Sequence, residues 1–209
     1  MEIKKESRIF VAGHRGMVGS AILRALKSRG FTNLIVAGSH DVDLRDAEAV
    51  RKFFLTNKPD FVFLTAARVG GIQANIKSPA EFLYENIMIQ TNVIHQSYVS
   101  GVKKLLILGS SCIYPKECPQ PMKEEYLLTG LLEPTNEGYA LSKIVALKQA
   151  EYYYRQYGFN AISLMPPNLY GPNDHFDFNR SHVLSALVRR FVDAIDERKD
   201  EITLWGTGI

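Results

Sequence analysis

Short apolar runs alternate with longer stretches of helical periodicity along most of this chain. Continuous apolar runs are typical of strands that are buried on both faces of a sheet. Strands that alternate with helices are joined by right-handed crossovers, which make the sheet parallel. The sequence therefore predicts an α/β fold with a doubly wound parallel sheet. The expected strands are Ile9–Ala12, Leu34–Ala37, Asp60–Leu64, Lys104–Gly109 and Asn160–Met165. The expected helices are Met17–Arg29, Asp46–Asn57, Glu85–Ser100, a Tyr-rich helix from near Tyr139, and Val183–Glu197.

The composition excludes several classes of protein. The chain has 209 residues, of which 46% are hydrophobic and 22% charged, with a net charge of +3, so it can bury a core and is not disordered. So small a positive charge gives no reason to expect nucleic acid as a partner. No apolar run is long enough to span a membrane, and no secretory signal follows Met1. Cys112 and Cys118 form neither a disulfide framework nor a zinc-site spacing. We expect a soluble cytoplasmic protein without a bound metal.

A glycine-rich turn follows the first expected strand. In such a turn, glycines permit the sharp bend, the close approach of a pyrophosphate and the tight packing of helix on strand. The N-terminus of the following helix adds N–H donors for phosphate. A tight turn without a ligand is the alternative, but the strand–turn–helix context favours a dinucleotide. The turn reads Gly13-His14-Arg15-Gly16-Met17-Val18-Gly19.

The tip of the second strand indicates which dinucleotide binds. An acidic residue there favours NAD, whereas a basic group accepts the 2′-phosphate of NADP. Ser39 and His40 occupy the tip, and Arg15 of the glycine loop can reach it. These residues favour NADP, while Asp41, close by, keeps NAD as the alternative.

Three residues have the chemistry of a carbonyl reductase. Tyr139 and Lys143 lie four positions apart, on one face of an expected helix, where both can address one substrate atom. A Lys ammonium and the nicotinamide charge are expected to lower the pKa of the phenol, which would make it a general acid. Ser110 follows the fourth strand, where open α/β sheets bind ligands. A solvated pair on an amphipathic helix is the alternative for Tyr139 and Lys143.

Six sequence blocks, spread nearly from end to end, carry a resemblance to a known family. The chain resembles the extended short-chain dehydrogenases/reductases that act on nucleotide sugars, and in particular the branch that epimerises and reduces GDP-4-keto-6-deoxy-mannose. The resemblance implies a Rossmann-type NAD(P)-binding domain over residues 1–165 and a smaller substrate-binding domain beginning at 166–209. Because relatives continue well past Trp205, it also implies that the chain is a fragment. The blocks are residues 13–19, 67–72, 109–115, 133–140, 168–172 and 181–183.

The resemblance also assigns roles to individual residues. Cys112 and His182 would be the acid/base pair for epimerisation at sugar C3 and C5, and Ser110, Tyr139 and Lys143 would serve the reduction at C4. On composition alone, Cys112 would be a buried small residue and His182 a structural one. Arg190 and Trp205 would contact the GDP part, with a solvated helix face and a core residue as their alternatives. The cofactor side would further include Leu108, Gly109, Lys143, Pro166, Asn168, Leu169 and His182.

The resemblance finally implies a partner and leaves two alternatives for the function. Helices Glu85–Ser100 and Tyr139–Tyr157 would pair with their copies in a homodimer, although their apolar positions fit a core equally well. The first alternative is another nucleotide-sugar epimerase, dehydratase or reductase of the same superfamily. The second is a dinucleotide-binding fragment with impaired catalysis.

Overall fold

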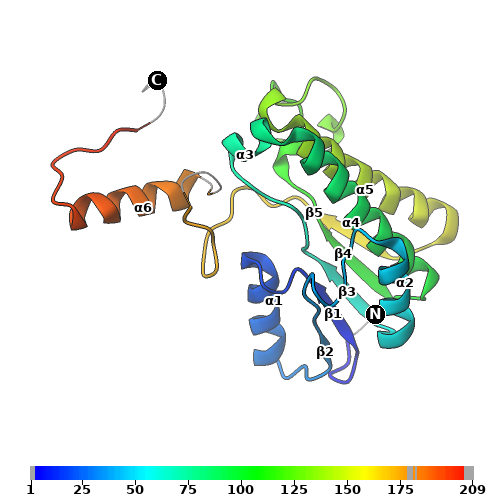
Figure 1. The fold of residues 1–209 in the computed structure, drawn as a ribbon. Helices are drawn as coiled ribbons and strands as arrows, with labels where there is room; N and C mark the ends of the chain where they lie inside the picture. The colour runs from blue at the N-terminus through cyan, green and yellow to red at the C-terminus, as the bar shows by residue number, and fades with distance from the viewer. Residues whose placement is uncertain (1–2, 178–180, 182, 205–209) are drawn as a thin grey trace.

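The computed structural model describes residues 3–177, 181 and 183–204. Its centre is a parallel sheet of five strands in the order β2-β1-β3-β4-β5 (Figure 1). In the centre of the sheet, Ile9 to Ala12 of β1 pair with Phe61 to Leu64 of β3. The predicted parallel α/β fold is confirmed. The strands are β1 (Ile9–Ala12), β2 (Leu34–Ile35), β3 (Phe61–Leu64), β4 (Lys104–Leu108) and β5 (Ala161–Leu164).

Helices connect the strands and extend beyond them. Helix α2 begins where Asp46 Oδ1 accepts hydrogen bonds from the N–H groups of Glu48 and Ala49, at 2.8 and 3.1 Å. The helices are α1 (Met17–Ser28), α2 (Ala47–Asn57), α3 (Ile72–Lys77), α4 (Pro79–Val99), α5 (Glu137–Tyr157) and α6 (Val183–Asp196). Three 3₁₀ turns are η1 (Ser111–Ile113), η2 (Glu124–Tyr126) and η3 (Pro134–Asn136).

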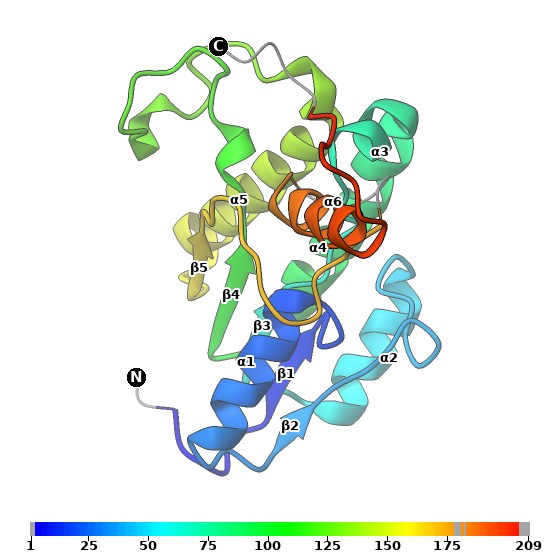
Figure 2. The same ribbon diagram turned by 90° about the vertical axis from the view of Figure 1, so that its left-hand side faces the viewer.

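The two faces of the sheet are covered unequally. Helices α2, α4 and α5 lie on one face, and α1 lies over the other beside β1 and β2 (Figures 1 and 2). On the α1 side, no helix of the described residues covers β4 and β5 (Figure 2). The side chains of Ile162 and Leu164 in β5 are accordingly 38% and 48% exposed. The expected coverage of both faces is therefore complete only around β1.

The core lies between the sheet and α2, α4 and α5. All four residues of β1 are completely buried, which explains why this strand is a continuous apolar run. Phe10 of β1 packs against Phe53 and Phe54 of α2, with ring centroids 4.7 and 6.0 Å apart. This packing fixes the carboxyl end of β1, from which the glycine loop departs.

Several element boundaries differ from the expectations. Helix α4 begins at Pro79 rather than Glu85, because proline suits the first turn of a helix, where its missing N–H is not needed. The short helix α3 was not expected. Strand β2 has only two residues, and Ile202 to Leu204 belong to no strand.

The segment after β5 leaves the sheet, and α6 stands apart from it (Figure 1). The exposed side of α6 is apolar, with Phe191 52% and Ile195 74% exposed. Within the described ranges, no helix has the length and hydropathy that crossing a membrane would require.

Candidate active site

The candidate site lies at the carboxyl ends of β1 and β3. From β1 the chain adds β2 on one side and then β3, β4 and β5 on the other, so the crevice between β1 and β3 is where open α/β sheets bind ligands. The glycine loop leaves β1 against the residues that follow β3. Thr65 Oγ1 donates a 2.6 Å hydrogen bond to the carbonyl of Ala12. Gly13 has a φ of +87°, and a Cβ there would lie 2.7 Å from the Ala66 nitrogen. Only glycine fits this position.

The same loop leads into α1 at close range. A Cβ on Gly19 would lie 2.2 Å from the Gly13 carbonyl oxygen, so glycine is needed for α1 to pack against the loop. Gly16 is the N-cap of α1, and no side chain caps the helix there. The first-turn N–H groups, beside His14, Met17 and Val18, can therefore donate to a phosphate. The loop fits the pyrophosphate of a dinucleotide.

The end of β2 brings Arg15 over the turn that follows the strand. The guanidinium carbon and both terminal nitrogens of Arg15 lie 3.3 Å from the position that a Cβ on Gly38 would take. The Asp41 carboxylate turns back and accepts a 2.7 Å hydrogen bond from the Gly38 N–H. Ser39 and His40 are exposed beside them. The turn after β2 therefore exposes the Arg15 guanidinium, while the Asp41 carboxylate is used in a hydrogen bond within the turn.

Ser110 and Cys112 follow β4 on the 3₁₀ turn η1. Ser110 is the N-cap, and its hydroxyl accepts a hydrogen bond from the Cys112 N–H at 3.4 Å. A Cβ on Gly109 would lie 2.3 Å from Met165 Sδ, so this glycine lets the ends of β4 and β5 meet. The turn thus holds the hydroxyl and the thiol at the carboxyl edge of the sheet.

Tyr139 and Lys143 lie one turn apart on α5. Lys143 is only 4% exposed, and its Nζ donates a 2.8 Å hydrogen bond to the carbonyl of Leu108 at the end of β4. The Lys143 nitrogen lies 5.6 Å from the centroid of the Tyr139 ring. The predicted common face is therefore confirmed, and the surface-pair alternative is wrong for Lys143.

Burial controls the pKa values of this group. Burial lowers the pKa of Lys143 to about 8. It raises the pKa of Tyr139 above its ordinary value, and the nearby Cys112 raises it further. It also raises the pKa of Cys112, against smaller opposing effects of Ser110 and Lys143. The sequence reading expected Lys143 and the nicotinamide charge together to lower this pKa; in the protein alone, burial of the phenol raises it. Tyr139 and Cys112 both hold their protons at neutral pH.

Two buried asparagines that the sequence reading missed fix the loop after β3. Asn86 of α4 is completely buried; its Oδ1 accepts from the Arg68 N–H at 2.7 Å and its Nδ2 donates to the Arg68 carbonyl at 3.0 Å. Asn75 of α3 donates to the carbonyls of Gly70 and Gly71, at 2.9 and 3.1 Å. No signal in the sequence reveals this role, because an asparagine that binds backbone groups has the same identity as one that faces solvent.

The remaining predicted residues come from the C-terminal segment. The Pro166 carbonyl accepts a 3.4 Å hydrogen bond from the Ser111 N–H, which joins this segment to η1. Asn168 and Leu169 are exposed, and Arg190 donates a 2.9 Å hydrogen bond to the Thr203 carbonyl. His182 and Trp205 lie outside the described residues. In the part of the chain that the structure describes, no cluster of three His, Cys, Asp or Glu side chains could hold a metal.

Comparison with known proteins decides the family. Residues 9–209 match the model of the NAD dependent epimerase/dehydratase family. The chain belongs to this family. Its curated relatives include GDP-L-fucose synthase 1 of Arabidopsis thaliana, 56% identical over 98% of this chain, and GDP-L-fucose synthase of Escherichia coli K12, 51% identical over 97%. In each case the chain spans 63% of the relative's length.

A solved structure in this family agrees with the fold. A GDP-L-fucose synthetase from Naegleria fowleri bound to NADP superposes with a TM-score of 0.89 at 28% sequence identity. The alignment covers 100% of this chain and 68% of that one. The glycine loop and the Tyr139–Lys143 helix therefore stand within the fold of an NADP-binding relative.

Proposed function

We propose that this chain is the cofactor-binding and catalytic part of an enzyme that converts GDP-4-keto-6-deoxy-D-mannose into GDP-L-fucose, by epimerisation at C3 and C5 and reduction at C4. The observation that carries the proposal is the convergence of Ser110 and Cys112 on η1 with Tyr139 and Lys143 on α5. Lys143 of α5 is hydrogen-bonded at 2.8 Å to the carbonyl of Leu108, two residues before Ser110, and α5 contacts η1, so these groups belong to one site. The relatives named GDP-L-fucose synthase support the substrate.

NADP is the dinucleotide that the residues fit. The uncapped N-terminus of α1 would hold the pyrophosphate, and Arg15 would pair with the 2′-phosphate. Asp41 already accepts the Gly38 N–H, which leaves it less able to bind ribose hydroxyls and weakens the case for NAD. Leu108, Gly109, Pro166, Asn168 and Leu169 would border the nicotinamide side. When bound, NADPH supplies the hydride that C4 receives.

Tyr139 would be the acid of the reduction. Its raised pKa keeps the phenol protonated at neutral pH, so a proton is available for the C4 oxygen as negative charge develops there. The Ser110 hydroxyl would donate a second hydrogen bond to this oxygen. Lys143, held by the Leu108 carbonyl, would stabilise the tyrosinate that remains and would contact the nicotinamide ribose.

Cys112 and His182 would be the epimerisation pair. The C4 keto group acidifies the C3 and C5 protons, because the resulting carbanion is delocalised as an enolate. Inversion needs a base on one face of the sugar ring and an acid on the other. Cys112 is protonated at neutral pH and can serve as the acid, which leaves the imidazole of His182 as the base, since imidazoles exchange protons near neutral pH. A 4-epimerase or dehydratase would not need this pair.

The substrate's GDP part and the partner chain complete the proposal. Arg190 would clamp the diphosphate and Trp205 would contact the nucleotide. The outer face of α4 and α5 would pair with a second copy. The cytoplasmic location expected from the sequence stays a prediction, which cell fractionation would test.

The deciding experiment incubates the purified chain with GDP-4-keto-6-deoxy-D-mannose and NADPH and follows substrate-dependent loss of NADPH absorbance. We expect loss, with GDP-L-fucose as the product. Loss with a different sugar product would favour another reductase of the superfamily. Binding of NADPH without any turnover would favour a dinucleotide-binding fragment with impaired catalysis.

A further inference from the structure

Helix α4 supports both of the loops that flank the glycine loop. Because β1 lies between β2 and β3, these are the loop after β2 (residues 36–46) and the loop after β3 (residues 65–71). Asn92 of α4 is 8% exposed, and its Nδ2 donates 3.0 Å hydrogen bonds to the carbonyls of Leu44 and Arg45 in the loop after β2. Asn86, earlier on the same helix, binds both backbone groups of Arg68 in the loop after β3. One helix therefore sets the position of both loops.

The side chain of Glu85, also on α4, joins the two loops to each other. Its Oε1 accepts a 2.6 Å hydrogen bond from Arg68 Nη1. Its Oε2 forms an ion pair with Arg45 Nη1 at 3.5 Å. The two oxygens of one carboxylate thus serve one loop each. We call this arrangement the Glu85 bridge.

Each arginine of the Glu85 bridge has a second partner that fixes its direction. Arg45 Nε and Nη2 donate to the two oxygens of the Asp43 carboxylate, at 2.9 and 2.8 Å. The guanidinium carbon of Arg68 lies 5.2 Å from the centroid of the Phe82 ring, within the range of a cation–π contact. A guanidinium that is held on two sides has few alternative positions, so the bridge relates the position of one loop to that of the other.

The Glu85 bridge adds little to the stability of the fold. The side chains of Arg45, Arg68 and Glu85 are 46%, 36% and 21% exposed. Ion pairs that water can reach contribute little to folding, because their charges are screened and the side chains lose freedom. Asn86 and Asn92 already hold the backbone of both loops. The effect of the bridge is therefore to restrict how far the two loops move relative to each other.

The adenosine half of a bound dinucleotide would lie between these loops. Its pyrophosphate would lie at the N-terminus of α1, and its ribose toward the end of β2, beside Arg15. The loop after β3 packs on the other side of the glycine loop, where a Cβ on Gly13 would lie 2.7 Å from the Ala66 nitrogen. The spacing of the two loops thus sets the width that is available to the adenosine half.

We propose that Glu85 is a positioning residue for NADPH: by joining Arg45 and Arg68, it keeps the loops after β2 and β3 at the spacing that the adenosine half of the cofactor requires. Glu85 acts through the two arginines and orders the loops before the cofactor arrives, so binding does not have to order them. The inference rests on the proposed function for the dinucleotide alone, and not for the sugar substrate.

The test titrates the purified chain with NADPH and follows the fluorescence of the bound cofactor. Glu85→Gln keeps the shape of the side chain but replaces one acceptor oxygen with an NH₂ donor, so it cannot accept from both arginines. We expect the dissociation constant of NADPH to rise about fivefold, as it would if the loops held the binding arrangement about one-fifth of the time. Glu81→Gln removes the same charge from an exposed position one turn earlier on α4, and should leave the dissociation constant unchanged.

A second arm separates positioning from a general loss of structure. The fragment 2′,5′-ADP carries the adenosine half without the nicotinamide, and its affinity, measured by displacement of NADPH, should fall by the same factor. The number of binding sites per chain and the midpoint of urea unfolding should stay at their wild-type values. A merely destabilised chain would instead lose binding sites and unfold in less urea, while its remaining sites bound normally.

A double-mutant cycle tests the bridge itself. Arg45→Gln, at the more exposed end of the bridge, should weaken NADPH binding about as much as Glu85→Gln does. The double variant should bind no more weakly than either single variant, because each change already breaks the same connection. If Glu85→Gln fails to fold, Arg45→Gln carries the test alone, with the same expected loss for NADPH and for 2′,5′-ADP.

The outcomes distinguish the two proposals. An unchanged dissociation constant in Glu85→Gln, or losses that add in the double variant, would overturn the inference. Tighter binding of NADPH by Glu85→Gln would also overturn it, because it would mean that the released Arg68 contacts the cofactor directly. These results leave the turnover of GDP-4-keto-6-deoxy-D-mannose, and so the proposed function, intact.

The converse result separates them as well. A chain whose NADPH binding depends on Glu85 as expected, but which turns over no substrate, would overturn the proposed function and leave the Glu85 bridge in place. A wild-type chain that binds no NADPH would overturn both.

Discussion

At the scale of single residues, burial of the Lys143 ammonium lowers the free energy of unfolding. Its pKa falls from 10.5 to about 8 because the ammonium is removed from water. Below pH 8 the group is charged in both the folded and unfolded states, so the folded state carries the whole destabilisation from burying the charge. Between pH 8 and 10.5 the unfolded chain binds more protons than the folded one, so the free energy of unfolding rises with pH. The shift corresponds to about 3 kcal/mol.

Lys143→Met should therefore stabilise the fold and abolish reduction. At pH 7 we expect its free energy of unfolding to exceed that of the wild type by about 2 kcal/mol, less than the full shift because the Leu108 carbonyl loses its donor. The difference should shrink as pH rises from 8 to 10.5. Urea unfolding of both proteins across this range checks the prediction. A variant less stable than the wild type at pH 7 would mean that the Leu108 bond outweighs desolvation.

Cys112→Ser tests the epimerisation role at the same scale. A serine hydroxyl has nearly the same shape but cannot exchange protons near neutral pH. We expect deuterium uptake from D₂O at C3 and C5 of the substrate to fall by about 10²- to 10⁴-fold, with unchanged NADPH affinity. Mass spectrometry of recovered sugar nucleotide measures the exchange. Cys118→Ser, at a second half-buried cysteine, should exchange like the wild type; undiminished exchange in Cys112→Ser would remove the thiol from the mechanism.

At the scale of elements, the packing of α1 on the glycine loop requires glycine at some positions of the loop and not at others. Gly19 contacts the Gly13 carbonyl so closely that a methyl group cannot enter, whereas a Cβ on Gly16 would lie 3.4 Å from the same oxygen, an ordinary contact. We expect Gly19→Ala to lower the free energy of unfolding by about 2 kcal/mol or more, because α1 must move off the loop. Gly16→Ala should fold normally. Thermal unfolding of both variants measures the contrast.

The proposed role of Arg15 in cofactor choice can be tested in the same loop. Its guanidinium lies over Gly38, where a 2′-phosphate would sit beyond β2. We expect Arg15→Ala to weaken NADPH binding about tenfold or more and to leave NADH binding nearly unchanged. Fluorescence titration with both cofactors checks this. Equal losses for the two would assign Arg15 to the shared pyrophosphate instead.

The sequence predicts these elements unevenly, for physical reasons. Strands such as β1 and β4 were readable because burial on both faces requires an unbroken apolar run. The first turns of α4 were missed because Pro79 was not recognised as the first residue of a helix, a position where its missing N–H costs nothing. Asn75 and Asn86 were missed because they bind backbone groups, which leave no trace in residue identity. Tyr139 and Lys143 were readable from their spacing, whereas Cys112 needed the family resemblance.

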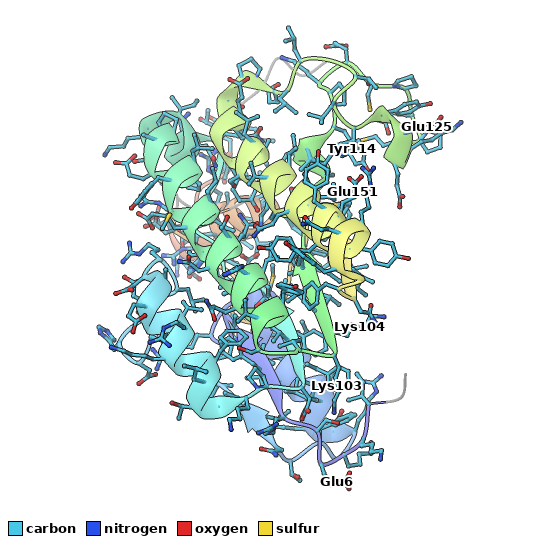
Figure 3. All side chains as sticks on the ribbon, turned by 90° about the vertical axis from the view of Figure 1, so that its right-hand side faces the viewer. Glu6, Lys103, Lys104, Tyr114, Glu125 and Glu151 are labelled. Atoms are coloured by element: carbon cyan, nitrogen blue, oxygen red, sulfur yellow. The ribbon has the colours of Figure 1, made fainter. Side chains whose placement is uncertain are left out.

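At the scale of the whole molecule, the outer face of α4 and α5 is an exposed surface with several apolar side chains and no partner within the described chain. The two helices lie side by side with no element of the described chain covering them (Figure 3). Leu141, Val145 and Tyr152 share one face of α5 and are 39%, 40% and 55% exposed, and Tyr84 and Val99 of α4 are 63% and 59% exposed. Their inner faces, with Ala146 and Ala150, are buried in the core, so the outer residues are not needed for the fold.

An apolar face on two helices that lie side by side suits pairing with the same face of a second copy, since a two-fold axis makes one patch serve both sides. Val145→Arg would place two like charges near such an axis without touching the core. We expect it to convert the proposed dimer into a monomer, with NADPH affinity unchanged because Lys143 points to the opposite side of α5. Sedimentation equilibrium measures the mass. Phe191 on α6 is also exposed, and Phe191→Gln is the matched control, which should stay dimeric. If Phe191→Gln dissociates and Val145→Arg does not, the interface lies on α6 instead.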